Sequence, residues 1–243
     1  MRDRLILLPG WGLGTAPLEP LAEALRGLDP RLHVEIEPLP QLDSGDPADW
    51  LDELDANLAQ DAWLGGWSLG GMLAAELAAR RGERCSGLLC LASNLRFVAE
   101  PSWPAAMAAE TFNAFRQGCA ADAAATLKRF ALLCAQGAAD ARGLSRLLLG
   151  AAPLPQAATV LAGLDVLAAL DTCRALQAFV GPQLHLFAGA DALVPAAAAS
   201  ALLELLPDVE IGLIDNASHA FALERPHEIA AAIQVFLHEA GDD

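Results

Sequence analysis

The segment GGWSLGG, residues 65–71, places one serine between two pairs of glycines. An apolar run, AWLGGW (62–67), precedes the serine, and an alanine-rich segment with helical spacing follows it. A serine at a sharp strand-to-helix turn needs small residues two positions on either side, because larger side chains would collide there. Gly66 and Gly70 occupy those positions. The pattern therefore predicts that Ser68 is a nucleophile. The alternative is that the glycines only let a helix pack on a strand, as in a dinucleotide-binding turn.

A serine hydroxyl is a weak nucleophile near neutral pH and needs a general base, which in turn needs a carboxylate to orient it. When a G-x-S-x-G turn carries the nucleophile, the acid and then the histidine follow it in the chain. Only one histidine, His219 in NASHAF, lies in a loop between the predicted last strand and the last helix. We therefore predict that His219 is the general base. The other histidines are expected in strands or on a solvated helix face: His33, His185, His227 and His238.

The carboxylate that orients the base should lie in the loop after the preceding strand. Asp191, in the segment FAGADALVP, follows the predicted strand 183–189. Asp215 is the alternative, but it lies four residues before His219 and is expected to end a strand or cap a turn. We predict that Asp191 completes a Ser-His-Asp triad, which requires no metal or cofactor.

Attack on a carbonyl also requires N–H donors for the oxyanion that develops, each worth about 3 kcal/mol. The backbone amide of Leu69 directly follows the nucleophile, and the helix predicted to begin there directs its dipole at the site. The second donor should come from the turn after the first strand, PGWG (9–12), where Trp11 is the candidate. The alternative for this segment is an ordinary glycine turn.

The elements that must position these residues follow from hydrophobic periodicity. Predicted strands alternate with predicted helices up to residue 93 and again after residue 182, which predicts an α/β fold with a mostly parallel sheet flanked by helices. Residues 101–178 contain helical segments with no clear strand between them. We interpret them as an all-helical lid inserted into a core formed by residues 1–100 and 179–243. The expected strands are 4–9, 32–40, 62–67, 85–93, 183–189 and 209–214, and the expected core helices are 17–28, 46–60, 69–82, 195–206 and 224–240.

Composition narrows the classes of protein. The chain has 243 residues, of which 54% are apolar, so it can bury a large core and disorder is not expected. The formal net charge of −16 disfavours nucleic acid and anionic membrane surfaces as general partners. No apolar run approaches the length of a membrane span, and the start MRDRLILLPGWG is interpreted as a first strand rather than an export signal. Five scattered cysteines without a CxxC pattern indicate free, mostly buried thiols, which favours the cytoplasm.

The motifs LLPGWG, GWSLGG, GADALVP and ASHAF, in this order, resemble those of the α/β-hydrolase superfamily. More narrowly, GWG with GWSLGG, the segment SNLRFVAEPSWP and the lid segment LKRFALLC resemble the BioH-type esterases, the pimeloyl-[acyl-carrier protein] methyl ester carboxylesterases of biotin synthesis. The resemblance covers nearly the whole chain. It implies an α/β-hydrolase fold, a triad of Ser68, Asp191 and His219, and an ester carbonyl bracketed by Trp11 and Leu69.

The resemblance also implies roles for the lid. Phe130 would line the channel for the pimeloyl chain, with Leu133 and Cys134 on the same helix face. Plain packing of the lid is the alternative for these three residues. Four basic residues would receive the acyl carrier protein, which is acidic: Lys128, Arg129, Arg142 and Arg146.

Charge is unevenly distributed in a way that fits such a partner. Residues 102–164 carry five basic and three acidic groups, a net charge of +2. Because the whole chain has a net charge of −16, the remaining residues carry −18. Because the screening length is about 8 Å at 0.15 M salt, a local basic face can attract an acidic partner despite distant acid. The alternative is that these basic residues form an ordinary solvated face.

This chain departs from the resembled family at three places. PQLDSGDP replaces the glycine-rich turn that is common after the second strand. The chain has Pro9-Gly10 where relatives usually have His-Gly, with little expected effect because the donor amide lies one residue later. It starts at the first parallel strand without an antiparallel hairpin, so the sheet should be one or two strands smaller. We expect a monomeric, cytoplasmic serine carboxylesterase that removes the methyl ester from pimeloyl-acyl carrier protein. The alternatives are a general short-chain carboxylesterase or thioesterase, and a catalytically inactive binding protein of the same fold.

Overall fold

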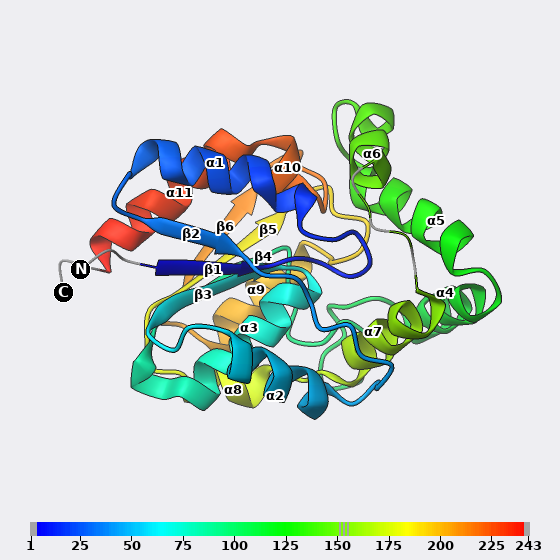
Figure 1. Cartoon of the computed structure of the whole chain (residues 1–243), viewed down its shortest axis with the longest axis horizontal. Helices are drawn as coiled ribbons and strands as arrows, with labels where there is room; N and C mark the ends of the chain where they lie inside the picture. Colours follow the sequence, from blue (N-terminus) through cyan, green and yellow to red (C-terminus); the bar gives the residue numbers. More distant parts are fainter. Residues whose placement is uncertain (1–3, 151, 153, 155, 241–243) are drawn as a thin grey trace.

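The computed structural model describes residues 4–150, 152, 154 and 156–240 (Figure 1). Six strands form one sheet in the order β2-β1-β3-β4-β5-β6, with every neighbouring pair parallel. The strands are β1 (Arg4–Leu8), β2 (His33–Ile36), β3 (Ala62–Trp67), β4 (Cys85–Leu91), β5 (Gln183–Ala188) and β6 (Glu210–Ile214). The predicted strands and the predicted parallel sheet are therefore confirmed.

The strand expected at 32–40 is shorter than predicted. It ends at Ile36, and residues 37–40 form a loop. Proline has no N–H to donate to a strand ladder, and prolines stand at positions 38 and 40. The sequence predicted that the strand breaks at these prolines, and it ends two residues before the first of them.

Burial explains why the central strands read as continuous apolar runs. Every residue of β3 and β5 is buried, and so are four of the five residues of β1, because helices cover both faces of the sheet. The two edge strands, β2 and β6, are only partly buried. The deepest part of the core therefore lies along β1, β3, β4 and β5, whose carboxyl ends meet at one edge.

The core helices form a layer on each face of the sheet (Figure 1). Helices α1 and α11 pack against each other on one face, and α2, α3, α8 and α9 cover the opposite face. Their bounds are α1 (Glu19–Leu28), α2 (Pro47–Asn57), α3 (Leu69–Arg81), α8 (Cys173–Ala178), α9 (Ala197–Leu205), α10 (Phe221–Glu224) and α11 (Pro226–Glu239), with short 3₁₀ turns η1 (Ala16–Leu18) and η2 (Gly82–Arg84). The predicted arrangement of a parallel sheet flanked by helices is confirmed.

Four helices lie beyond the carboxyl ends of the strands: α4 (Ala109–Ala121), α5 (Ala123–Ala135), α6 (Ala141–Gly150) and α7 (Ala157–Ala169) (Figure 1). The chain returns to the core at Thr172, whose backbone N–H and Oγ1 both donate to the carbonyl oxygen of Leu95. Helix α8 then packs on α3. For the lid expected at residues 101–178, we propose that α4 to α7 form the lid itself and that α8 belongs to the core.

The five cysteines are free thiols, four of them buried and Cys173 half-buried. Burial raises the pKa of the Cys90 thiol to about 12, which keeps it protonated at neutral pH. Within the described residues, no helix combines the length and the apolar character that crossing a bilayer would require.

Candidate active site

Ser68 occupies a strained turn between β3 and α3. Its backbone has φ 55° and ψ −119°, a conformation that residues other than glycine rarely adopt. The chain folds so tightly here that a β-carbon at position 66 would lie 2.3 Å from the carbonyl carbon of Gly70. A β-carbon at position 70 would lie 2.2 Å from the carbonyl oxygen of Leu8. Both flanking positions must therefore be glycine, for the steric reason that the sequence motif indicated.

The end of β4 holds this turn in place. The N–H of Ser68 donates to the carbonyl oxygen of Leu91 at 2.8 Å, and the hydroxyl of Ser93 donates to the carbonyl oxygen of Ser68 at 2.7 Å. A β-carbon at Gly71 would lie 2.0 Å from Oγ of Ser93, so the third glycine makes room for that hydroxyl. The sequence analysis did not single out Ser93. Its position directly after a buried strand beside the predicted nucleophile was the available signal.

His219 and Asp191 form a buried pair. Nδ1 of His219 lies 2.7 Å from Oδ2 of Asp191, and their side chains are 0% and 1% exposed. The other carboxylate oxygen accepts from the backbone amides of Leu193 at 2.7 Å and Val194 at 3.0 Å. Asp215, the alternative acid, is exposed on the loop after β6. The geometry therefore favours Asp191 as the group that orients the imidazole.

The second ring nitrogen of His219 is free. Because Nδ1 donates its proton to the carboxylate, Nε2 keeps its lone pair, and it has no hydrogen-bond partner among the described residues. The ring packs against Trp67, the residue before Ser68, with their centroids 5.6 Å apart. An oriented imidazole with an available lone pair can accept a proton from a serine hydroxyl, and Trp67, which the ring contacts, directly precedes Ser68.

Three successive residues of the loop after β6 are each bound to a different element. The N–H and hydroxyl of Ser218 donate to Glu224 in α10. The carbonyl oxygen of His219 accepts from Nε1 of Trp67 in β3 at 2.9 Å. The N–H of Ala220 donates to the carbonyl oxygen of Cys134 in α5 at 3.2 Å. The position of the imidazole is therefore fixed jointly by the core, by the following helix and by the lid.

Two backbone amides are available for an oxyanion. Leu69 is the first residue of α3, and Trp11 lies in the turn after β1. Neither amide donates a hydrogen bond to another described residue. A β-carbon at Gly10 would lie 2.9 Å from the Trp67 ring, so this turn packs directly against the residue before the nucleophile. The turn that carries the Trp11 amide thus contacts the Trp67 ring, and Leu69 lies two residues after Trp67 in the chain.

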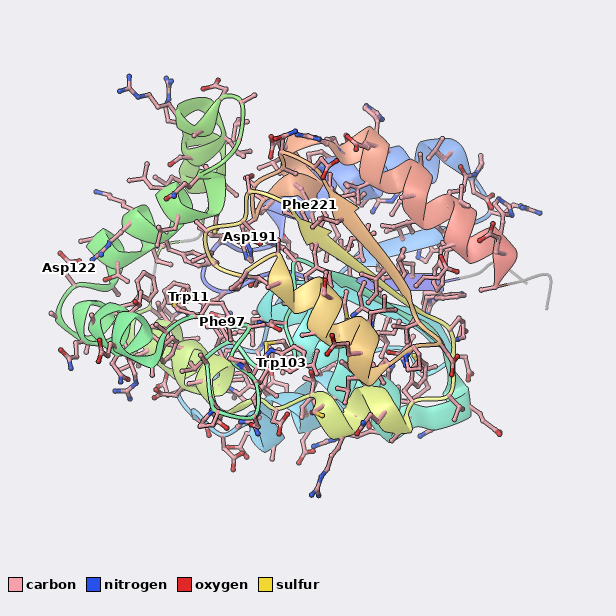
Figure 2. All side chains as sticks on the ribbon, turned by 180° about the vertical axis from the view of Figure 1, so that it is seen from behind. Trp11, Phe97, Trp103, Asp122, Asp191 and Phe221 are labelled. Carbon is pink, nitrogen blue, oxygen red and sulfur yellow. The ribbon has the colours of Figure 1, made fainter. Side chains whose placement is uncertain are left out.

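The Trp11 side chain reaches into the lid. Its Nε1 donates to the carbonyl oxygen of Val160 in α7 at 2.8 Å. Its ring packs edge-on against Phe130 of α5, with centroids 4.9 Å apart, and against Phe115 of α4 at 5.6 Å. Figure 2 shows Trp11 beside the lid helices and Asp191 in the loop that follows β5. The sequence analysis assigned Trp11 for its backbone alone and did not find this contact.

The predicted lid residues differ in their surroundings. Phe130 is 3% exposed and packs on Trp11, whereas Leu133 is half-buried against the core. Cys134 is fully buried, and burial together with the nearby Asp191 carboxylate raises the pKa of its thiol well above the ordinary value. Cys134 therefore lies close to the acid of the pair, where its thiol stays neutral.

A cavity of about 380 Å³ adjoins the turn that carries Trp11. Its walls come from that turn, from residues 38–41 and from the start of α7, and they include Trp11 but none of Leu69, Phe130, Leu133 or Cys134. Ser68 itself is 4% exposed. Ser68, Asp191 and His219 are thus covered in this structure, and none of them lines the cavity.

The four basic residues predicted to dock a partner are all exposed: Lys128 and Arg129 on α5, and Arg142 and Arg146 on α6. Across the described residues, none of the four forms an ion pair. In contrast, Arg116 of α4 binds Asp165 of α7 through two nitrogens. The basic face is therefore available to a partner, and it lies away from the triad.

The remaining histidines have other surroundings. His185 is 2% exposed within β5 and contacts Oε1 of Gln183 at 3.3 Å, and burial lowers its pKa to about 4. His33 pairs with Glu35, and His227 and His238 are exposed on α11. His185 is thus a neutral structural residue, as the sequence analysis expected.

The chain is similar to known hydrolases over nearly its whole length. Residues 5–232 match the profile described as the Alpha/beta hydrolase family. The chain is 37% identical over 247 residues to the pimeloyl-[acyl-carrier protein] methyl ester esterase of Aromatoleum aromaticum, covering 96% of this chain and 97% of that one. It is 33% identical to the protein of the same name from Aeromonas hydrophila, covering 96% and 94%.

A further relative is longer. The chain is 36% identical to the biotin biosynthesis bifunctional protein BioHC of Cellvibrio japonicus, covering 97% of this chain but 47% of that protein. It therefore spans about half the length of this relative.

Solved structures with the same fold are more distant in sequence. A bromoperoxidase from Bacillus anthracis superposes with a TM-score of 0.79 at 20% identity, covering 98% of this chain and 92% of that one. The esterase EaEST from Exiguobacterium antarcticum gives 0.79 at 15% identity, covering 97% and 92%. At these sequence identities the structural similarity establishes the fold but does not identify the substrate.

Proposed function

Because this chain belongs to the alpha/beta hydrolase family, and within it to the pimeloyl-[acyl-carrier protein] methyl ester esterases, we propose that it is a serine carboxylesterase of biotin synthesis. Its substrate is the methyl ester of a pimeloyl group attached to acyl carrier protein, and its products are the free carboxylate and methanol. The observation that carries this proposal is the likeness to named esterases over almost the full length of both chains.

The first half of the proposed reaction forms an acyl-enzyme. Nε2 of His219 takes the proton of the Ser68 hydroxyl while Oγ attacks the ester carbonyl carbon. The amides of Leu69 and Trp11 donate to the oxygen that becomes negative. His219 then gives the proton to the departing methoxide, so methanol leaves and the acyl group stays on Ser68. The bond between Asp191 and Nδ1, at 2.7 Å, supports this role because it stabilises the imidazolium that forms.

The second half releases the acid. His219 removes a proton from a water molecule that attacks the acyl carbonyl, and the same proton returns to Oγ of Ser68 as the acyl bond breaks. The carboxylate leaves and the enzyme is restored. Burial of the triad side chains supports this chemistry, because excluding water strengthens the interactions that stabilise the oxyanion.

The lid is proposed to recognise both ends of the substrate. Phe130, with Leu133 and Cys134 on the same helix, contacts the apolar pimeloyl chain. The exposed face of Lys128, Arg129, Arg142 and Arg146 receives the acidic carrier protein. The absence of ion pairs at these four residues in the described structure supports this role, because their charge is not already neutralised. We further propose that the enzyme acts as a monomer in the cytoplasm, where its free thiols are stable.

Mass spectrometry of pimeloyl-acyl carrier protein methyl ester after incubation with the enzyme tests the proposal. The wild type should remove the methyl group, and Ser68→Ala should lower kcat by roughly 10⁴-fold or more. Ser86→Ala is the matched control, because Ser86 is exposed in β4 away from the turn.

The alternatives give different results. If the carrier-bound ester survives while p-nitrophenyl butyrate is cleaved, the protein is a general esterase or thioesterase. If neither ester is cleaved and a fluorophosphonate does not label Ser68, the protein is a catalytically inactive binding protein.

A further inference from the structure

The loop that carries His219 is held by a carboxylate outside the triad. Oε2 of Glu224, the last residue of α10, accepts two hydrogen bonds from Ser218. One comes from the backbone N–H at 3.0 Å and the other from Oγ at 2.8 Å. Ser218 directly precedes His219 and is fully buried. The Glu224 side chain is only 12% exposed, so water screens these two bonds weakly.

Helix α10 is a firm support for this carboxylate despite its short length. Phe221 at its start is fully buried. The N–H of Phe221 donates to the carbonyl oxygen of Ser218 at 3.1 Å, which closes a turn around His219. The N–H and the carbonyl oxygen of Ser218, the residue before His219, are therefore both hydrogen-bonded.

The neighbouring Arg225 holds the other end of the same loop. Its guanidinium donates to the carbonyl oxygens of Asp215 at 3.0 Å and Asn216 at 2.6 Å. Asn216 has φ 52°, a left-handed conformation that needs such support. Glu224 thus accepts from Ser218 near one end of the loop after β6. Arg225 donates to the carbonyl oxygens of Asp215 and Asn216 at its other end.

Among the described residues, Glu224 is the one acceptor for the N–H of Ser218. The carbonyl oxygens on either side are held separately: that of Ala217 accepts from the N–H of Ala190 at 3.0 Å, and that of Ser218 accepts from the N–H of Phe221. Loss of the Glu224 carboxylate would therefore leave a buried N–H and a hydroxyl of Ser218 without their acceptor, while these backbone bonds remain.

We infer that Glu224 is a positioning residue: through Ser218 it fixes the imidazole of His219 relative to Ser68. The inference rests on the proposed function, since it concerns the same general base. A misplacement of about 1 Å in a catalytic group can reduce the rate roughly 100-fold. Glu224 contacts Ser218 and not the substrate carbonyl, so its loss should lower kcat and leave KM unchanged.

The test compares Glu224→Ala, Glu224→Gln and Glu228→Ala with the wild type, using p-nitrophenyl butyrate. Each kcat is expressed per active site titrated with a fluorophosphonate, so unfolded protein is not counted. Glu224→Ala should lower kcat roughly 10- to 100-fold with KM within about twofold. Glu224→Gln should retain most activity, because its amide oxygen can accept both bonds. Glu228 is the control, since it is exposed and also contacts Arg225.

A kcat for Glu224→Ala equal to that of the control would overturn the inference, and so would a change confined to KM. If Glu224→Ala does not fold, Ser218→Ala decides. It removes one of the two bonds and should lower kcat about threefold, whereas an unchanged kcat rejects the role. The proposed substrate is tested separately. A wild type that cleaves p-nitrophenyl butyrate but not the carrier-bound ester refutes that substrate and leaves the Glu224 comparison valid.

Discussion

Two helices of the inserted segment, α7 and α6, are attached to the core in opposite ways. Helix α7 is fastened to it: the carbonyl oxygen of Val160 accepts from Trp11, and Oγ1 of Thr159 lies 3.1 Å from Oδ1 of Asp43. A β-carbon at Gly163 would lie 2.8 Å from the Trp11 ring, so the helix rests directly on that residue. Helix α6 packs mainly against α5, and Leu147 on it is 63% exposed. One helix supports the turn with the proposed oxyanion donor, and the other presents surface.

The sequences of the two helices explain the difference. AATVLAGLDVLAA, in α7, is apolar on nearly all sides and suits a helix enclosed by neighbours. ARGLSRLLLG, in α6, has one apolar stripe and one basic face, which suits a helix with one side in water. The inserted segment therefore combines one helix that supports the candidate site with another that has one side exposed to solvent.

The largest expected effect comes from removing the residue on which α7 rests. Trp11→Ala deletes a buried side chain, the bond to Val160 and the contact with Phe130, and should reduce the free energy of unfolding by about 3–5 kcal/mol. Leu147→Ala on α6 should change it by less than about 0.5 kcal/mol, because that side chain is largely exposed. Urea unfolding of both variants measures the contrast. Similar losses would mean that α6 and α7 are equally attached.

An intermediate effect should come from acid, which acts on the core through His185 in β5. The pKa of His185 is about 4 in the folded protein and about 6.5 in the unfolded chain, so the unfolded chain binds the proton first. The stabilisation is complete above pH 6.5 and is lost as pH falls toward 4. At pH 4.5 the loss is on the order of 2–3 kcal/mol. Residues 101–178 contain no histidine, so this loss acts through the core and not through the lid.

The pH effect is measured as the difference in unfolding free energy between pH 7 and pH 4.5. His185→Leu should reduce that difference by an amount on the order of 2–3 kcal/mol. Glu76, whose pKa is raised by burial, acts in the opposite direction in both proteins and cancels in the comparison. His227→Gln, at an exposed site on α11, is the control and should behave as the wild type. A His185 variant with unaltered acid sensitivity would contradict the assignment.

The smallest expected effect tests the exposed helix. The double variant Arg142→Glu/Arg146→Glu should raise KM for the carrier-bound ester roughly tenfold, equivalent to about 1.4 kcal/mol. KM for p-nitrophenyl butyrate and the unfolding free energy should not change. The effect should shrink at high salt, because exposed charges are screened.

A matched control keeps the total charge the same. Arg84→Glu/Arg174→Glu reverses two exposed charges, before β4 and in α8. It should leave KM for the carrier-bound ester near the wild-type value. If both double variants raise KM equally, net charge rather than the basic face of α6 controls carrier binding.

Much of the architecture could be predicted because it follows from short-range rules. Alternating and continuous apolar runs located all six strands, and the glycines around Ser68 could be explained by contacts within a few residues. The strand expected at 32–40 ends at Ile36, ahead of the two prolines that interrupt its pattern. The end of the inserted segment was harder to place, because α8 has a helical sequence like its predecessors and only its packing on α3 separates it from them.

By itself, the sequence determined the order of strands and helices, the strained turn at Ser68 and the loop that carries His219. These features depend on the hydrophobic periodicity and on steric clashes between residues that are close in the sequence, so a short segment is enough to predict them. The tertiary structure alone decided that Trp11 holds α7 and that Glu224 turns back onto Ser218, and it brought Asp191, the acid that the sequence favoured, to His219. Most of these contacts join segments that are distant in the chain, and even the local one depends on where a short helix packs. No periodicity specifies which side chains then come within hydrogen-bonding distance.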